Sequence, residues 1–399
     1  MRFLLDDINF KKRDRRAAIL AAHPNIEVRI FNPHRFGSMR LLEVVPNFSR
    51  LNKRMHNKIM VADNACGILG GRNIADEYFG MNESYNNRDL DMMAVGPVVT
   101  EISATFDEFW NSIGAVPIEV LVNKEFDGDD YRSEIAFLRN EAGPKPHAYS
   151  RDLATGALRA RIRRIESQLV WARGEVLHDT VDSMKRNGAG ATLERALVSR
   201  IAGSKRELLI ESAYFVMREP GIDFIRSLTS RGVRVRVLTN SLASNDVLVA
   251  QAGYSKRRGK LIDAGVDHFE LRPDAVAVLR QVTPEARGGF TTLHTKALVI
   301  DGEKAFVGSY NLDPRSAEIN SEIGLMVHSP VFARQVKAFL DEGVRSGNAY
   351  SVVRDGRGRV QWRTNVGGEP RTWSRDPETN GFRRFLSGTF AILPIENQL

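Results

Sequence analysis

Two stretches of the chain place short apolar runs with strand-like alternation around a segment with the apolar spacing of an amphipathic helix. They share the order strand, helix, strand: residues 2–6, 14–22 and 26–31 in the first, and residues 233–239, 247–264 and 266–271 in the second. Strands that alternate with helices are typical of mostly parallel sheets covered by helices on both faces. The pattern therefore predicts an α/β fold made of two similar halves.

Each stretch leads into the same polar motif. RMHNKIMVADNACGILGGRN and TLHTKALVIDGEKAFVGSYN carry His, Lys, Asp and Asn at identical spacing: His56, Lys58, Asp63 and Asn73 in the first copy, and His294, Lys296, Asp301 and Asn311 in the second. After each motif come a predicted strand, DLDMMAVG or SEIGLMVH, and a helix that opens with proline. Aligning these prolines places Asp89 opposite Glu322. The chain is thus an internal duplication, a pseudo-dimer of two lobes.

The repeat also predicts the domain organisation. We expect a first lobe over residues 1–125, a second lobe over residues 191–345 and a C-terminal tail over residues 346–399. The inter-lobe segment between the lobes, residues 126–190, is charged, and we expect it to be irregular except for the strand-like stretch QLVWARGEVLHD. The second half contains a helix, a strand and a helix over roughly residues 191–232 that have no counterpart in the first half. We therefore expect the first lobe to lack its N-terminal strand and helices, in a chain shortened at its N-terminus.

Composition narrows the function classes. The 399 residues include 57 Lys and Arg against 49 Asp and Glu, a formal net charge of +8, and a single cysteine, Cys66. One cysteine excludes a scaffold held by internal disulfides. No apolar stretch approaches the roughly 18 residues of a membrane-spanning helix. The positive charge favours a polyanionic partner, either nucleic acid or an anionic membrane surface, and does not choose between them.

The repeated residues fit the chemistry of a phosphodiester. His and Lys two positions apart on a strand would project from the same face of the sheet. A neutral imidazole can act as nucleophile or general acid, and the neighbouring ammonium group can stabilise an anionic oxygen. Asn73 and Asn311 add amide donors. Two copies around one cavity would let one His attack phosphorus while the other protonates the leaving oxygen.

The acids divide into two groups. We expect Asp89 to orient His56 and Glu322 to orient His294, because a catalytic imidazole needs its second nitrogen held. We interpret Asp63 and Asp301, in the turns after the motif strands, as structural acids that pair locally. A metal site is disfavoured because a lysine between the supposed ligands would repel the cation, and no cofactor is expected.

These residues resemble the phospholipase D superfamily, whose HKD motif is matched twice, and within it the bacterial cardiolipin synthases of the type C branch. The resemblance also rests on RLNKRMHNK, GGRNIADEYFG, ESAYFV, GSYNLDPRS and the terminal LPIENQL. It implies one active site built from two half-sites with His56, Lys58, Asp63, His294, Lys296 and Asp301 as its catalytic set. It further implies a phosphatidyl group carried by His56, acid and base catalysis by His294, and cardiolipin formation from phosphatidylglycerol.

Two alternatives stay open: a phospholipase D or nuclease that hydrolyses a phosphodiester, and an inactive, truncated lipid-binding fragment. The expected partners are phosphatidylglycerol, with phosphatidylethanolamine as a further candidate, and an anionic membrane surface, rather than nucleic acid. We expect a peripheral protein on the cytoplasmic side of the bacterial inner membrane.

A C-terminal amphipathic helix would dock the protein on that membrane through one apolar face: Phe382, Phe385, Leu386, Phe390 and Leu393. Arg383 and Arg384 would attract anionic lipid, and Pro394 would end the helix. The alternative is that the helix packs on the second lobe as an ordinary terminal helix.

Overall fold

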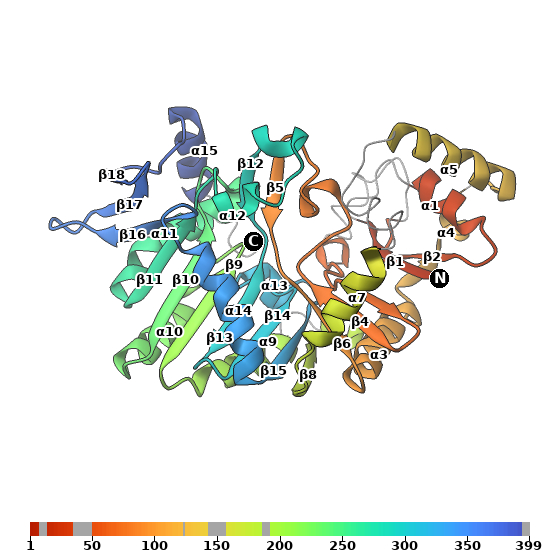
Figure 1. The fold of residues 1–399 in the computed structure, drawn as a ribbon, viewed down its shortest axis with the longest axis horizontal. Coiled ribbons are helices and arrows are strands. Elements are labelled where there is room, and N and C mark those ends of the chain that lie inside the picture. Colours follow the sequence, from red (N-terminus) through yellow and green to blue (C-terminus); the bar gives the residue numbers. More distant parts are fainter. Residues whose placement is uncertain (8–13, 35–49, 123, 143–156, 186–191, 393–399) are drawn as a thin grey trace. The chain divides into compact units, whose positions relative to one another are not determined.

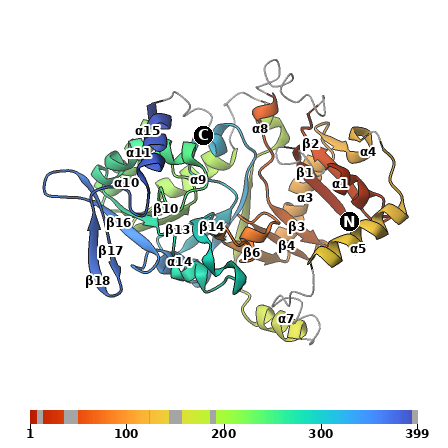
Figure 2. The same cartoon turned by 90° about the horizontal axis from the view of Figure 1, so that it is seen from above.

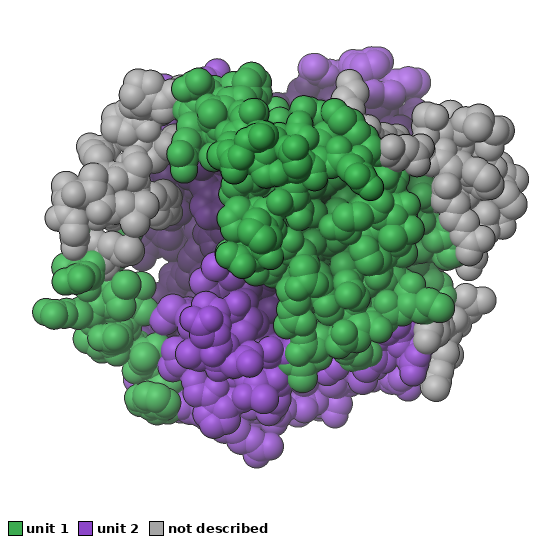
Figure 3. All heavy atoms as spheres, turned by 90° about the vertical axis from the view of Figure 1, so that its right-hand side faces the viewer, with its two compact units in different colours: residues 1–56, 104–171 green, residues 57–103, 172–399 purple. Residues whose placement is uncertain are grey.

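The computed structural model describes residues 1–7, 14–34, 50–122, 124–142, 157–185 and 192–392. They form two compact units, coloured in Figure 3: unit 1 contains residues 1–56 and 104–171, and unit 2 contains residues 57–103 and 172–399. Helix α3 (Val98–Trp110) runs from unit 2 into unit 1. Residues 57–103, which the repeat assigns to the first lobe, thus group with the second half of the chain.

Unit 1 is built on a small sheet. Strands β1 (Arg2–Asp6) and β2 (Glu27–Phe31) are parallel and joined by α1 (Asp14–Ala21), which confirms the predicted strand, helix and strand. The short β7 (Ala115–Pro117) pairs antiparallel with β2. Buried residues of α1 and β2, among them Ala17, Val28 and Ile30, form the core beneath α4 (Ile118–Leu121).

Residues 126–190 contain more regular structure than expected. They include helices α5 (Gly128–Ala142), α7 (Ala157–Ser167) and α8 (Val181–Lys185). The Asp127 carboxylate starts α5 by accepting hydrogen bonds from the backbone N–H groups of Asp129 and Asp130. The expectation of an irregular segment is wrong here, because it was based on the high density of charged residues and overlooked short apolar stripes such as Ile162 and Ile165 of α7. The strand-like stretch is confirmed as β8 (Arg173–His178).

Unit 2 contains a ten-stranded sheet in the order β18-β17-β16-β11-β10-β9-β13-β14-β15-β8 (Figures 1 and 2). Its central strands β9, β10 and β11 are parallel, and all the other pairings are antiparallel. The strands from β9 to β15 are β9 (Glu207–Ser212), β10 (Arg234–Asn240), β11 (Val266–Leu271), β13 (Lys296–Ile300), β14 (Lys304–Gly308) and β15 (Ile323–His328).

Helices cover both faces of this sheet. On one face α9 (Thr192–Ala202), α10 (Glu219–Ser230) and α11 (Leu248–Asp263) bury their apolar sides against alternate strand residues such as Leu208 and Ile210. On the other face α14 (Pro330–Gly343) packs against residues such as Leu209 and Val299. This alternation is that of strands buried on both sides. The predicted second half is therefore confirmed element by element.

The first motif belongs to a separate three-stranded sheet in unit 2. Strands β3 (Ile59–Ala62), β4 (Cys66–Gly70) and β6 (Asp91–Val95) are antiparallel in the order β3-β4-β6. Leu69 and Met92 from this sheet share an apolar core with Val307 and Leu325 of β14 and β15. The strands that follow the two motifs therefore pack face to face within one unit.

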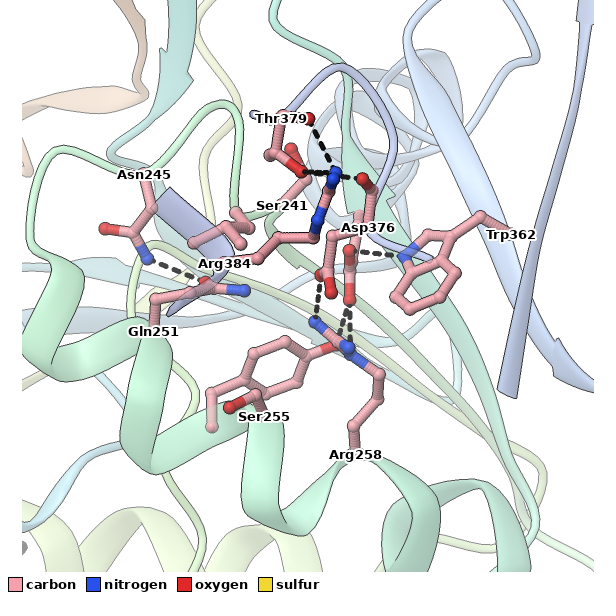
Figure 4. Close-up of polar contacts among 12 residues, drawn as sticks. Ser241, Asn245, Gln251, Ser255, Arg258, Trp362, Asp376, Thr379 and Arg384 are labelled. Atoms are coloured by element: carbon pink, nitrogen blue, oxygen red, sulfur yellow. Dashed lines mark hydrogen bonds and ion pairs between the residues drawn. The ribbon is translucent and has the colours of Figure 1, made fainter. Parts of the chain in front are cut away.

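The C-terminal region extends the large sheet with three strands that the sequence did not predict: β16 (Ala349–Arg354), β17 (Val360–Val366) and β18 (Glu369–Trp373). The predicted terminal helix is confirmed as α15 (Gly381–Ile392), which packs on α11. Figure 4 shows how the chain before it is fixed: the buried Arg258 of α11 lies 2.7 Å from Glu270 and 2.9 Å from Asp376. Leu393 and Pro394 lie outside the described residues. Within the described part of the chain, no helix has the length and apolarity needed to span a membrane.

Candidate active site

A short parallel pairing joins the first half of the sequence to the second motif. Strand β5 (Tyr85–Arg88) pairs with β12 (Phe290–Leu293), and the register sets Arg88 opposite Leu293. The Arg88 carbonyl then accepts hydrogen bonds from the backbone N–H groups of His294, at 2.8 Å, and Thr295, at 3.1 Å. Since the strands are parallel, the next residue on each, Asp89 and His294, come together.

Asp89 holds the second-motif histidine. Its Oδ2 lies 2.8 Å from Nδ1 of His294, and both residues are buried. The expected assignment of Asp89 to His56 and of Glu322 to His294 is therefore wrong. An ionised carboxylate can only accept a hydrogen bond, so we assign the imidazole proton to Nδ1 and the lone pair to Nε2. With its lone pair, Nε2 can then attack or take a proton.

Lys296 lies beside this pair. Its Nζ is 3.0 Å from His294 Nδ1 and donates to the His294 carbonyl at 2.5 Å. Lys296 is the first residue of β13, so His294 precedes the strand. The expectation that both residues lie on one strand is therefore wrong. Their side chains nevertheless lie close together. Burial lowers the pKa of Lys296 to about 8, against the opposing effect of Asp89.

Three cations act on the Asp89 carboxyl. Burial raises its pKa to about 6, while Lys296, Arg72 and Lys58 each lower it. Lys58 belongs to the first motif and lies in unit 2, so charges from both motifs act on the same acid. The site thus concentrates positive charge where a phosphate oxygen would need it.

Tyr78 closes the other side of the imidazole. It ends the short helix η3 (Asp76–Tyr78), and its hydroxyl lies 3.4 Å from Nε2 of His294 with the two rings nearly perpendicular, at 82°. The Asn73 side chain donates to this hydroxyl at 2.8 Å, which places the motif asparagine beside the reacting nitrogen. Sequence reasoning missed Tyr78, because the second copy of the repeat has no tyrosine at the matching place.

Gly71 makes room for the acid. A Cβ at this position would lie 2.2 Å from Asp89 Oδ1, so only glycine permits the close approach. The next residue, Arg72, donates to the Asp89 carbonyl at 2.9 Å and to the Tyr78 carbonyl at 3.3 Å, and pairs with Asp91 at 2.7 Å. Arg72 therefore fixes both residues that flank His294.

Asn240 at the end of β10 positions the backbone before His294. Its side chain donates to the Leu293 carbonyl at 2.8 Å and accepts from the Leu293 N–H at 2.8 Å. On the other strand of the pair, the buried Arg88 contacts Glu211 of β9 at 3.3 Å. Neither Asn240 nor Arg88 belongs to the repeat, so comparison of the two halves could not reveal them.

The other members of the second motif are also placed. Asn311 is buried, and its Oδ1 has no hydrogen-bond partner among the described residues. Glu322 is fully buried and accepts from the Ser309 hydroxyl at 2.5 Å. Asp301 accepts hydrogen bonds from the backbone N–H groups at the start of β9: Lys205, Arg206 and Glu207. Asp301 thus pairs locally with backbone, as expected of a structural acid.

The first motif is divided between the units. His56 is the last residue of its segment in unit 1, directly after Met55, whose N–H donates to Asp6 of β1 at 2.9 Å. In unit 2, Asn57 accepts a hydrogen bond from the Ser321 hydroxyl at 2.7 Å. Asp63 lies exposed in the turn between β3 and β4. Among the described residues, no group of three or more His, Cys, Asp or Glu side chains is arranged to hold a metal ion.

Comparison with known proteins agrees with this architecture. Residues 197–342 match the family described as Cardiolipin synthase, PLD-like domain. The chain is 35% identical over 405 residues to Cardiolipin synthase C of Escherichia coli (strain K12), an alignment covering 99% of this chain and 84% of that protein. It is 25% identical over 296 residues to a Cardiolipin synthase of Staphylococcus aureus (strain N315), covering 73% of this chain and 47% of that protein.

A solved structure, the phosphatidylserine synthase of Haemophilus influenzae Rd KW20, superimposes with a TM-score of 0.53 at 14% identity, over 87% of this chain and 71% of that one. At this identity the likeness concerns the fold alone. It confirms the predicted α/β class.

Proposed function

The chain belongs to the cardiolipin synthases of the phospholipase D superfamily, and we propose that it makes cardiolipin by transferring a phosphatidyl group from one phospholipid to phosphatidylglycerol. The observation that carries this proposal is the arrangement around His294. An imidazole with Nδ1 held by Asp89 and Nε2 facing Tyr78, next to the Lys296 ammonium group, suits proton transfer at a phosphodiester.

In the proposed first step, His56 attacks the phosphorus of the donor lipid. The bond from phosphorus to the headgroup oxygen breaks, and the imidazolium form of His294 gives that oxygen its Nε2 proton, which releases the headgroup alcohol and leaves His294 neutral with its remaining proton on Nδ1. In the second step, a hydroxyl of phosphatidylglycerol gives its proton to Nε2 of His294 and attacks phosphorus, and the bond between phosphorus and His56 breaks. The phosphatidyl group has then moved from the donor lipid to phosphatidylglycerol. The acceptor's proton restores His294 and the loss of phosphorus restores His56, so both histidines recover the forms in which the first step began.

The surrounding side chains support these steps electrostatically. The ammonium groups of Lys58 and Lys296 would stabilise the extra negative charge on the phosphate oxygens, the task that a metal ion performs in other phosphotransferases. Ionised Asp89 favours the imidazolium form of His294 after it takes the proton. Asn73 holds the Tyr78 hydroxyl at the edge where the acceptor would arrive. We keep Asp63 and Asp301 as motif residues whose role is to place the motif strands.

We further propose that the protein acts as a peripheral protein on the cytoplasmic side of the inner membrane, with α15 at the lipid surface. Phe382 and Phe385 of α15 are 69% and 68% exposed, an apolar pair available to enter the headgroup region. The expected contribution of the arginines needs correction. Arg383 donates to the Leu242 and Asn245 carbonyls. Arg384 donates to Thr379, as Figure 4 shows. Both bind protein, so lipid affinity would come mainly from the phenylalanines.

The test is incubation of the purified chain with labelled phosphatidylglycerol, alone and with phosphatidylethanolamine, in mixed micelles containing EDTA. We expect labelled cardiolipin, and we expect the His294→Ala variant to accumulate a labelled, acid-labile adduct on His56. Release of phosphatidic acid without cardiolipin would contradict the proposal and favour a hydrolase. A labelled adduct on His294 instead of His56 in the wild type would reverse the roles of the two histidines.

A further inference from the structure

An apolar cavity of about 380 Å³ lies beside the second motif, within unit 2. It is partly open to solvent and is bordered by α9, α10, β9 and α13 (Pro314–Glu318). Its walls are mainly aliphatic and aromatic: Leu197, Ile201, Ile210, Phe215, Phe224 and Leu312. The volume falls within the range of about 300–1,000 Å³ that is usual for small-molecule sites.

The polar side chains that line the cavity already have partners. Arg218 pairs with Glu318, and Asp313 accepts from the backbone N–H of Ser316 at 2.7 Å. The Glu194 carboxyl is hydrogen-bonded by Tyr310, while burial raises its pKa. An occupant therefore gains little from hydrogen-bonding groups of its own, and a saturated hydrocarbon fits the lining better than a sugar, nucleotide or peptide would.

One wall of the cavity is formed by the residues that follow the second motif. Leu312 and Asp313 follow Asn311 of the second motif directly in sequence. The buried Asp313 carboxyl interacts electrostatically with the Lys296 ammonium group. A phosphate placed at His294 and Lys296 would thus lie close to Asp313, one of the residues that line the apolar cavity.

We propose that this cavity binds one acyl chain of the phospholipid whose phosphate reacts at the second motif. The inference rests on the proposed function, since it takes the substrate to be a phospholipid. Each methylene group removed from water contributes about a factor of four in affinity, so the depth of the cavity would set a preference for chain length.

The experiment fills the cavity from two different walls. Ala317→Phe adds a ring from α13, and Val198→Phe adds one from α9. The matched control is Ala338→Phe, which adds the same ring at an exposed position on α14. Two readouts are compared: the ratio of kcat/KM for long-chain over four-carbon phosphatidylglycerol, and the affinity for a lysophosphatidylglycerol with a fluorescent long chain. Melting temperatures identify any variant that fails to fold.

We expect at least one cavity variant that folds to lower the long-to-short ratio by about tenfold or more and to weaken binding of the fluorescent lipid similarly, with the control unchanged. Unchanged ratios and affinities in every cavity variant that folds would overturn the inference and leave cardiolipin formation standing. Cavity-dependent binding by an enzyme that makes no cardiolipin would support the cavity and overturn the proposed function. Equal binding of a free fatty acid with the same fluorescent chain would assign the site to fatty acids in place of phospholipid.

Discussion

The two copies of the motif lie in very different surroundings. In the second copy, β13 pairs with β9 on one side and β14 on the other, and all five of its residues are buried. In the first copy, β3 pairs with β4 alone among the described strands, and its residues alternate between half-buried and exposed. The same spacing of His, Lys and Asp is therefore held by a sheet interior in one copy and by a sheet edge in the other.

The motif aspartates explain part of this difference. Asp63 and Asp301 occupy equivalent turns with the same left-handed backbone, at φ values of 51° and 55°. Asp301 accepts hydrogen bonds from the start of β9 and so ties β13 to its neighbouring strand. Asp63 is exposed in its turn. In the second copy the aspartate of the motif thus fixes the edge between two strands.

The copies also differ in what they supply to each other. Asp89, Tyr78 and Asn73 come from the first half of the sequence, yet they surround His294 of the second motif. The duplication therefore produced a crossed arrangement in unit 2, in which the acid of one copy orients the histidine of the other.

The largest expected effect comes from removing the imidazole that this crossed pair positions. We expect His294→Ala to lower kcat for cardiolipin formation by at least about 10⁴, because the proton donor and acceptor of both steps is lost. The control is His328→Ala, which removes a histidine of β15 whose ring lies 3.2 Å from Glu175, and this variant should stay within about twofold of wild type. Retention of one per cent of activity by His294→Ala would contradict the role assigned to it.

The turns after the two motif strands offer a sharper comparison. In Gly71→Ala, the new methyl group would meet the Asp89 carboxylate, so we expect kcat to fall about 100-fold through a displaced orienting acid. In Ser309→Ala, the matched position of the second copy, a hydroxyl bonded to Glu322 is lost, and we expect a loss of about tenfold or less. Equal losses of kcat in the two variants would mean that the contact between Asp89 and His294 contributes no more to catalysis than the contact between Ser309 and Glu322.

The pH dependence follows from the same residues. With a pKa of about 6, Asp89 gains a proton as pH falls below 6 and can no longer accept from Nδ1 of His294. With a pKa of about 8, Lys296 loses its charge as pH rises above 8. We therefore expect kcat to be bell-shaped, changing about tenfold per pH unit outside the interval from 6 to 8. Asp89→Asn should remove the acidic limb, and an unaltered acidic limb in that variant would assign it to another group.

The smallest expected effect concerns folding. We expect Asp301→Ala to lower the free energy of unfolding by about 2 kcal/mol, because three backbone N–H groups at the start of β9 lose a charged acceptor, and Asp63→Ala to change it by less than about 0.5 kcal/mol. Burial opposes ionisation of Asp301, but its backbone hydrogen bonds hold the pKa below its usual value. Its contribution is therefore present at neutral pH and is lost as pH falls through its titration. Urea unfolding of both variants at pH 7 and pH 3 measures this.

Periodicity and the repeat were enough to predict most of the regular structure. The elements around both motifs were found because their apolar residues recur at helical or strand spacing, and the boundaries of β1, β11 and α14 were correct to the residue. The helices α5 and α7 were missed because their apolar stripes are short and stand among many charged residues. The strands β16 to β18 were missed because half of their residues or more are exposed or half-buried, which weakens the apolar alternation.

The sequence predicted residues that form the site, but it assigned Asp89 to the wrong histidine. The repeat identified His294, Lys296 and Asp89, but it could only assign each acid to the histidine of its own copy. The actual partner depends on β5, a polar strand with the sequence YNNR, pairing with β12 about two hundred positions away, as the separation of 205 between Asp89 and His294 reflects. Such a pairing leaves no local signal in the sequence.

The measurement that tests the crossed arrangement most directly is ¹⁵N NMR of histidine-labelled protein, with the His294 signals assigned by their loss in His294→Gln. At pH 7 the account predicts that His294 carries a proton on Nδ1, the nitrogen that Asp89 holds. It predicts that Asp89→Asn disturbs this tautomer, while Glu322→Gln leaves it unchanged. A tautomer that survives Asp89→Asn and is lost in Glu322→Gln would contradict the account.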